Sequence, residues 1–186
     1  VPLKVRSMAP VAQASSTSGN STKVYKVGDY YDDGTKQGVV FYVDATGQHG
    51  KIVSLDHVAK EWCSSAQFHK GIVVGASSKS DGKANTDKVM SRSDSVKYPA
   101  FVWCRAKGKD WYLPAIDELK LLYSVRDTIN RTLNERGGNT LSGWYWSSTE
   151  YENDKKFCAC SVRMYYGKTN YNGKGNDFYV RAVSAF

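Results

Sequence analysis

The chain has 186 residues, of which 41% are apolar and 13% aromatic, which is enough to bury one core and too few for two domains of ordinary size. Its net charge of +8 is diffuse, since residues 1–82, 83–143 and 144–186 carry nine, eleven and six basic side chains against seven, seven and four acidic ones. Nucleic-acid binding requires a concentrated basic stripe, so we expect no nucleic-acid partner.

The N-terminal residues 1–23 are rich in Ser, Thr, Ala and Pro and contain few side chains that can anchor to a core. This composition predicts a flexible linker or stalk, followed by one domain over residues 24–186. No apolar run approaches the length that spans a bilayer. We therefore expect the domain to be attached to something upstream, and to meet a membrane only through an anchor there.

Two strands are predicted at the start of the domain. Residues 38–43 are rich in β-branched and aromatic side chains, residues 44–50 contain turn formers, and residues 51–55 form a returning strand. The sequence from 56 to 82 predicts irregular structure. An opening hairpin followed by loops is therefore expected.

The middle of the chain predicts helices. Asn85 or Thr86 can cap a short helix near residues 87–91, and Pro99 fits the first position of a second helix. The longest pattern runs from Ile116 to Glu135, with apolar residues at three- and four-residue steps. Strands, then helices, then strands are the order of an α+β fold, in which we expect the N- and C-terminal strands to share one sheet.

The four cysteines, Cys63, Cys104, Cys158 and Cys160, permit disulfides without requiring them, and three pairings are possible. Cys158 and Cys160 would point to one face of a strand, where they pair poorly with each other. Free, buried cysteines that act as small hydrophobes are the alternative.

The residue spacings that catalysis or metal binding requires are missing. His49, His57 and His69 form no helical pair that could hold a metal. Asp117 and Glu118 resemble paired catalytic carboxylates, but they lie in the first turn of the long helix, where negative charge stabilises the helix dipole. We expect no catalytic residue, no metal and no cofactor.

An aromatic triplet, Trp144, Tyr145 and Trp146, offers a platform on which a sugar ring could stack. Alternation along a strand would bury Tyr145 and expose both tryptophans, or the reverse. Because large aromatic side chains are mostly buried, we expect the two tryptophans in the core.

The last fifth of the chain suggests a display surface. Residues 165–177 are a run of Tyr, Asn, Gly and Lys that a hydrophobic core would not absorb, between two β-favouring ends. Tyr supplies rigid contact area, and Asn and Gly supply adaptable hydrogen bonding, as in binding loops. The alternative is a solvated hairpin tip in which Asn and Gly serve only the turn.

Several fragments occur in an order and at spacings typical of a known family. They are Asp-Gly-Lys-Ala-Asn-Thr at 81–86, Tyr-Pro-Ala at 98–100 with Cys104, Trp-Tyr-Leu-Pro at 111–114 with Glu118, Tyr-Trp-Ser-Ser-Thr-Glu-Tyr at 145–151, and Val-Arg-Ala-Val at 180–183. With these motifs the chain resembles bacterial domains of C-type lectin-like fold, the kind found at the end of a collagen-like adhesin. The resemblance covers roughly residues 24–186.

The resemblance implies a compact module with two main helices on a small, twisted, mostly antiparallel sheet, with its N- and C-terminal strands adjacent. The chain is also similar to the variable proteins that retroelements diversify, which change at codons for Asn, Tyr and Ser. That likeness implies scaffold positions at Ala159, Val162, Met164, Gly167 and Lys174. It implies candidate ligand-binding residues at Tyr151, Ser161, Arg163, Tyr165, Tyr166, Lys168, Asn170, Tyr171, Asn172 and Asn176.

The chain departs from two better-known groups that share this broad fold. Calcium-dependent lectins use a Glu-Pro-Asn or Gln-Pro-Asp loop and a Trp-Asn-Asp strand, and neither occurs, so we expect no calcium dependence. Sulfatase-modifying enzymes depend on particular cysteines or a copper site. Cys158 and Cys160 lie on one strand and give no match that supports oxidase chemistry.

The sequence therefore predicts a non-catalytic ligand-binding module of a secreted or cell-surface bacterial protein, such as an adhesin or an outer-membrane-anchored lipoprotein. Its C-terminal surface would bind an unknown protein or glycan ligand. Two alternatives are an enzyme of the formylglycine-generating, sulfatase-modifying type and a structural pilus-tip or adhesin domain.

Overall fold

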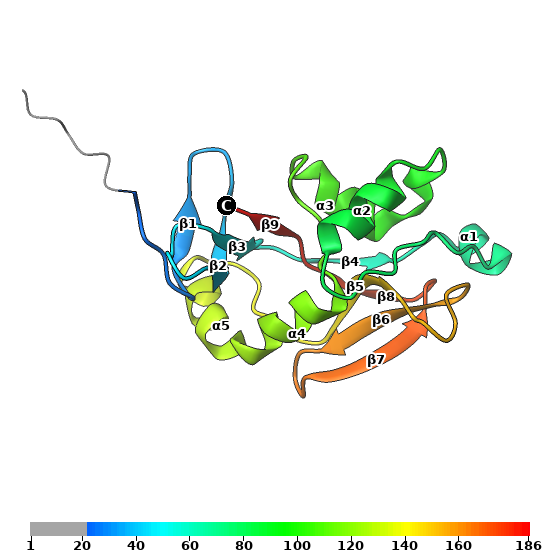
Figure 1. The fold of residues 1–186 in the computed structure, drawn as a ribbon. Coiled ribbons are helices and arrows are strands. Elements are labelled where there is room, and N and C mark those ends of the chain that lie inside the picture. The colour runs from blue at the N-terminus through cyan, green and yellow to red at the C-terminus, as the bar shows by residue number, and fades with distance from the viewer. Residues whose placement is uncertain (1–21) are drawn as a thin grey trace, which may run out of the picture.

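The computed structural model describes residues 22–186 (Figure 1), so most of the linker predicted for residues 1–23 lies outside the described residues. The described residues form α-helices and mainly antiparallel strands, which confirms the α+β class. The strands are β1 (Tyr30–Asp32), β2 (Gln37–Val43), β3 (Gly50–Val53), β4 (Val58–Glu61), β5 (Trp144–Glu150), β6 (Cys158–Arg163), β7 (Lys168–Gly173), β8 (Asp177–Val180) and β9 (Val183–Ala185). The helices are α1 (Ser65–Lys70), α2 (Gly82–Met90), α3 (Pro99–Ala106), α4 (Ile116–Ser124) and α5 (Arg126–Glu135), with a short 3-10 turn at Ser95–Lys97.

The first sheet joins the two ends of the domain. Its strand order is β1-β2-β3-β9, and it contains the predicted hairpin as β2 and β3. The C-terminal strand β9 pairs antiparallel with β3, Ile52 opposite Ser184. The ring centroids of Tyr25 and Phe186 are 5.1 Å apart, so the start of the described chain lies beside its end, as Figure 1 shows.

The second sheet, in the order β4-β8-β5-β6-β7, carries the remaining C-terminal strands. The prediction that N- and C-terminal strands share a sheet is confirmed by the pairing of β9 with β3 and of β8 with β4. The division of the strands between two sheets was not predicted. Strand β8 ends at Val180, and the buried residues Arg181 and Ala182 carry the chain from the second sheet to the first. The buried hydrophobic residues form two cores, and each contains residues of both sheets.

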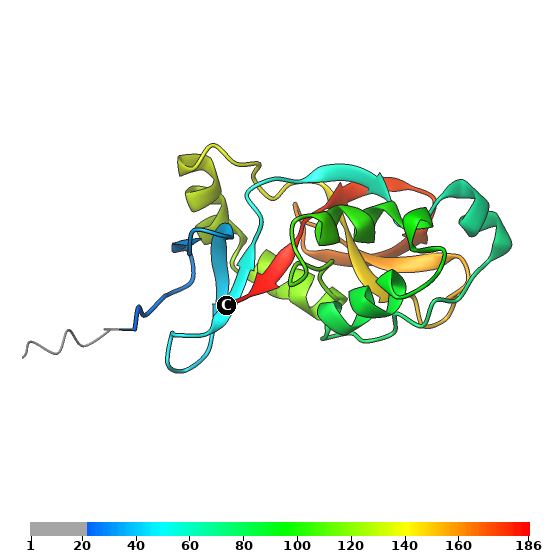
Figure 2. The same ribbon diagram turned by 90° about the horizontal axis from the view of Figure 1, so that it is seen from above.

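The two cores occupy different parts of the fold. In one, α2 and α3 lie over the second sheet, as Figure 2 shows from above, and Trp62, Phe101 and Trp146 are fully buried there. In the other, α4 and α5 pack against both sheets and bury Leu119 and Tyr145. The second sheet thus receives helices on two sides, and β7 is its outer strand at the end beyond β6.

The long helix predicted from Ile116 to Glu135 is two helices, separated at Val125. Val125 has φ −113° and ψ 15°, outside the helical region, and the Ser124 hydroxyl donates to the carbonyl of Leu121 at 2.6 Å. A β-branched residue after a back-bonding serine is a weak point in a helix. The predicted inward residues, among them Leu122, Ile129 and Leu133, are nevertheless buried.

Three smaller differences concern residues 56–91. The helix predicted at 87–91 begins at Gly82, because Asp81 rather than Asn85 or Thr86 caps it and accepts from the Ala84 amide at 2.9 Å. Strand β4 and helix α1 were predicted as irregular, since four and six mostly polar residues give no detectable period. None of the described helices has the length and apolar character that a membrane span requires.

Candidate functional site

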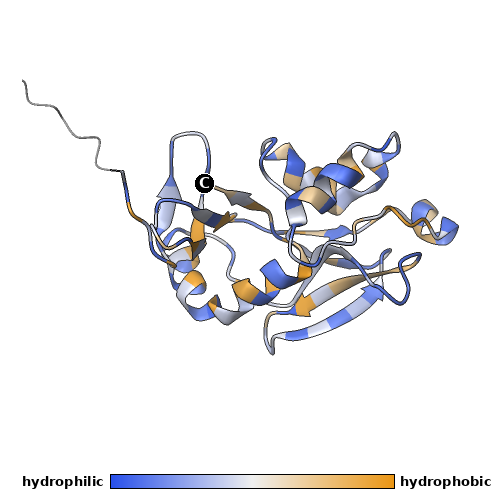
Figure 3. Cartoon of the chain, in the orientation of Figure 1, coloured by the Kyte–Doolittle hydropathy of each residue, from blue (hydrophilic) through white to orange (hydrophobic). Residues whose placement is uncertain are grey.

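The candidate site is built on the hairpin of β6 and β7, residues 158–173, which we call the display ribbon. Its two strands pair antiparallel from Arg163 opposite Lys168 to Cys158 opposite Gly173. β7 is the outermost strand of its sheet. Figure 3 shows it hydrophilic along its length beside the more hydrophobic β6, which agrees with a strand whose faces and edge meet solvent.

Four of the five predicted scaffold positions in and next to the ribbon are buried. Ala159, Val162 and Met164 are fully buried, and Lys174 is 1% exposed. Gly167 has φ +68° in the turn, and a side chain there would collide with the ring of Tyr123. These residues fix the ribbon against α4 and the core.

The candidate ligand-binding residues fall on two faces of the ribbon. The register places Arg163, Lys168, Asn170 and Asn172 on one face, because partners across a ladder share a face. Tyr171 is on the other face, where its ring stacks on that of Tyr151 at 4.0 Å between centroids. The sequence predicted that these residues form one surface, whereas in the structure they lie on two opposite faces of the ribbon.

Tyr165 and Tyr166 lie in the turn between the strands and are 69% and 62% exposed. The Arg126 guanidinium of α5 donates to the carbonyls of Met164 and Tyr165, which ties the turn to the helices. The two tyrosine rings contact edge to face with centroids 4.6 Å apart. Two exposed rings are thus held on a fixed backbone.

Ser161 is wrong as a display residue, since its side chain is fully buried. It lies opposite Trp146 on one side and Asn170 on the other, and its hydroxyl donates to the Asn172 side-chain oxygen at 2.9 Å. A small residue is required there because Trp146 fills the neighbouring space. Asn176 is exposed, but its amide donates to the Gly173 carbonyl at 2.9 Å and so also closes a turn.

The prediction that both tryptophans lie in the core is half wrong. Tyr145 and Trp146 are fully buried, on opposite faces, because helices cover both sides of β5. Trp144 at the start of the strand is only half-buried, and its ring stacks on Phe178 with centroids 5.9 Å apart. The alternation of side chains along a strand predicts which residues share a face. It does not predict how far the helices that bury each face extend along the strand.

Four side chains form a continuous series that we call the aromatic row: Phe178, Trp144, Arg163 and Tyr166. The Arg163 guanidinium carbon lies 5.7 Å from the Trp144 ring centroid and 4.9 Å from that of Tyr166. Such cation–π contacts hold a long side chain in place while its donors stay available. Trp144 and Phe178 were not predicted as ligand contacts.

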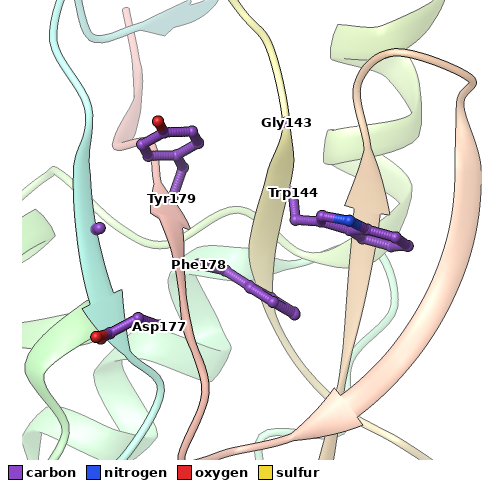
Figure 4. A pocket seen from close by; sticks show the side chains of 6 residues that line it. Gly143, Trp144, Asp177, Phe178 and Tyr179 are labelled. Carbon is purple, nitrogen blue, oxygen red and sulfur yellow. The ribbon is translucent and has the colours of Figure 1, made fainter.

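A hollow of about 410 Å³ adjoins the aromatic row (Figure 4). In Figure 4 the rings of Trp144 and Phe178 extend to one side, and the Tyr179 ring stands apart from them. The sequence predicted a β-favouring end after residue 177, and no sequence signal separates an aromatic residue that lines a hollow from one in the core. The lining residues are Ala59, Gly143, Trp144, Asp177, Phe178 and Tyr179.

The family-like motifs form a buried hydrogen-bond network. The Glu118 carboxylate accepts from the amides of Gly82 and Ala115 at 2.8 and 3.1 Å. It also accepts from the Tyr112 hydroxyl at 2.6 Å and the Lys51 ammonium at 3.0 Å. Asn85 likewise donates to the Ser148 hydroxyl at 3.0 Å, so three distant motifs meet in one interior.

The four cysteines are all free. Cys104 is fully buried, and burial raises the pKa of its thiol well above the usual range, which makes it unreactive. Cys158 and Cys160 are partly exposed and unpaired on β6, as expected for neighbours on one face. Among residues 22–186 there is no group of three or more His, Cys, Asp or Glu side chains placed to hold a metal ion.

His57 belongs to a partly buried cluster that includes Tyr179, one of the residues lining the hollow. Its Nδ1 lies 2.6 Å from the Tyr145 hydroxyl, and its ring stacks on Tyr179 at 4.0 Å. Arg181 is fully buried, donates to the carbonyls of Asn139 and Leu55, and leaves its Nε and Nη1 without a partner. The cluster thus contains one buried cation that is only partly hydrogen-bonded.

Protonation of His57 should destabilise the fold. Burial, and then the charge of Arg181, lower the pKa of His57 below its usual 6.5. As the pH falls through about 6.5 the unfolded chain takes up this proton before the folded chain does, so the free energy of unfolding decreases below that pH. Urea unfolding at pH 7.5 and 5.5 should show the decrease, and His57→Gln should reduce it. An equal decrease in the variant would assign it to other groups.

The sequence of the chain matches a known protein family. The model of the family described as the Lcl C-terminal domain matches residues 61–184. This span covers the motif network, both helix pairs and the display ribbon. The family is one of C-type lectin-like domains related to the variable proteins of diversity-generating retroelements, as the motifs implied. A search of the curated proteins finds no match.

Proposed function

The chain belongs to the family of Lcl C-terminal domains, and from this membership we propose that it is a non-catalytic module that binds a protein or glycan ligand through the display ribbon and the aromatic row. The family is one of lectin-like binding domains and not a known enzyme family. The mechanism is a rigid scaffold that carries aromatic and Arg anchors with adaptable Asn and Lys contacts around them.

One observation carries the proposal: exposed aromatic rings stand on a backbone that buried residues hold in place. Tyr165 and Tyr166 lie on a turn tied to α5 by Arg126, and Arg163 is held between two rings. A preorganised surface loses little conformational entropy when it binds. Tyr and Arg are also the residue types that dominate binding energy at interfaces.

Replacement of Tyr165, Tyr166 and Tyr171 together by Ala should abolish ligand capture on glycan and protein arrays. The three rings are more than half exposed, so their loss removes contact area from the surface without opening the core. The matched control is Tyr42→Ala on β2, a 43% exposed tyrosine of the other sheet, which should bind as the unmodified chain does. Undiminished capture by the triple variant would refute the proposal.

We propose in addition that the module acts outside the cell, secreted or held at the surface by an upstream anchor, and that residues 151–179 are diversified by a retroelement. The high content of Tyr and Asn in this segment supports diversification. The test is the DNA beside the gene: a near-copy of its 3′ end that differs almost only at adenines, next to a reverse transcriptase gene. Labelling of intact cells with an antibody against the domain tests the location.

A further inference from the structure

A second concavity lies on the face of the display ribbon opposite the aromatic row, and we call it the ribbon cleft. It has a volume of about 190 Å³ and lies between β6, β7, the segment after β5 and the first turns of α4. Tyr151 and Tyr171, which are separated in sequence, come together at its rim. Its lining residues are Lys79, Ile116, Lys120, Glu150, Tyr151, Glu152, Asn153, Cys160 and Thr169, with the Tyr171 ring against Tyr151.

The size of the ribbon cleft limits what it can accept. Pockets for drug-sized ligands and cofactors typically enclose about 300–1,000 Å³. A cleft of about 190 Å³ is too small for a sugar chain or a cofactor. It is of the size that receives one large side chain, as do the pockets for anchor residues at protein interfaces.

The walls of the ribbon cleft favour an apolar occupant. Its base includes Ile116, which is 3% exposed, and the partly buried Cys160. At the entrance, the rings of Tyr151 and Tyr171 stack nearly parallel, with 5° between their planes, and present an aromatic surface. Glu150 also lines the cleft, but its carboxylate is already bound by Lys174 and by two backbone amides.

At the rim of the ribbon cleft, the ammonium group of Lys120 has no hydrogen bond to its neighbouring carboxylate. Lys79 Nζ is 3.0 Å from Glu152, a direct ion pair. Lys120 Nζ is 3.8 Å from Asp117, which is too long for a hydrogen bond. Lys120 is 51% exposed and can therefore turn toward a carboxylate placed at the entrance.

From these features we infer that the ligand of the proposed binding module is a protein, and that the ribbon cleft takes one of its large apolar side chains while Lys120 binds a carboxylate next to it. The inference rests on the proposed function and narrows its ligand from protein or glycan to protein. The carboxylate is either the C-terminus of the partner or the side chain of a neighbouring Asp or Glu.

The test is a titration followed by ¹H–¹⁵N NMR with three probes. N-acetylphenylalanine carries a terminal carboxylate, acetyl-Phe-Asp-amide carries a side-chain carboxylate, and N-acetylphenylalanine amide carries none. Either carboxylate probe should shift the amides of residues 151–153, 160 and 169, and the stronger probe identifies the source of the carboxylate. The amide should bind about fivefold more weakly, the range of one exposed ion pair.

Two variants and a control assign the binding to this cleft. Thr169→Trp fills the entrance and should abolish the shifts, and Lys120→Gln should remove the difference between acid and amide. The control is Thr140→Trp, which adds the same ring at an exposed threonine outside the display ribbon. Absence of shifts with both carboxylate probes, or equal shifts in Thr169→Trp, would overturn the inference.

This result is independent of the array experiment. If the probes leave the cleft unshifted while the arrays show capture of a glycan that the triple tyrosine variant loses, the proposed function stands and the inference about the cleft is wrong. If neither the arrays nor the probes give a signal, both are wrong.

Discussion

Replacement of Lys174 by Met should destabilise the domain by about 3–5 kcal/mol, the usual cost of removing one partner of a buried ion pair. Lys174 and Glu150 are 1% and 0% exposed, with 2.7 Å between Nζ and Oε2. Lys174 Nζ also donates to the carbonyls of Ile72 and Lys155 at 3.2 and 2.6 Å. Its loss leaves a buried carboxylate without a counter-ion and two carbonyls without a donor.

Urea unfolding followed by circular dichroism measures this cost. The control Lys168→Met removes an exposed lysine of the display ribbon and should change the free energy of unfolding by less than about 0.5 kcal/mol. The double variant Lys174→Met/Glu150→Leu should recover only part of the loss, because the amides of Val74 and Gly75 then lack their acceptor. Equal stabilities of Lys174→Met and Lys168→Met would show that the pair does not hold the loops together.

Replacement of Glu118 by Ala should have an effect of similar size. The carboxylate is 5% exposed and accepts four hydrogen bonds, from two backbone amides, one hydroxyl and one ammonium. Each buried donor left unpaired costs about 1–3 kcal/mol. Two of the four donors are backbone amides that cannot turn toward water, so we expect a loss of at least about 2 kcal/mol.

The position of Glu118 also explains why residue 82, which lies against it, is a glycine. A side chain at Gly82 would lie 2.7 Å from Glu118 Oε1 and 2.6 Å from the Leu113 carbonyl, so helix α2 approaches this site only with Gly. The matched control is Glu152→Ala, which removes a carboxylate that is 69% exposed and paired on the surface. A comparable loss in Glu152→Ala and Glu118→Ala would contradict the role of the network.

The part of the fold that follows from local pattern could be predicted from the sequence. Hydrophobic periodicity and turn or capping residues within about ten positions predict three features. These are the hairpin of β2 and β3, the start of α3 at Pro99, and the inward residues of α4 and α5. The second sheet depends on contacts between distant segments, and the break at Val125 follows a side-chain hydrogen bond from Ser124 to the backbone. Neither is visible in the spacing of apolar residues.

Only the part of the candidate site that depends on local composition could be predicted from the sequence. Composition identified the ribbon as a surface, and exposed Tyr165, Tyr166 and Tyr171 agree with that prediction. The burial of Ser161 follows from Trp146 beside it, and the exposure of Trp144 follows from the end of helix cover. The division of the ribbon into an aromatic row and a cleft requires the strand register, which the sequence does not state.

We propose that buried polar contacts fix the shape of the domain and leave the exposed tyrosines free to bind a ligand. Calorimetric unfolding of the Tyr165/Tyr166/Tyr171 triple alanine variant, beside Lys174→Met, tests it most directly. The triple variant should lose no more than about 3 kcal/mol, since one stacked pair and one edge-to-face pair are worth about 0.5–1.5 kcal/mol each. Lys174→Met should lose more. A triple variant that unfolds as readily as Lys174→Met would contradict the claim, because the tyrosines would then be part of the structural core.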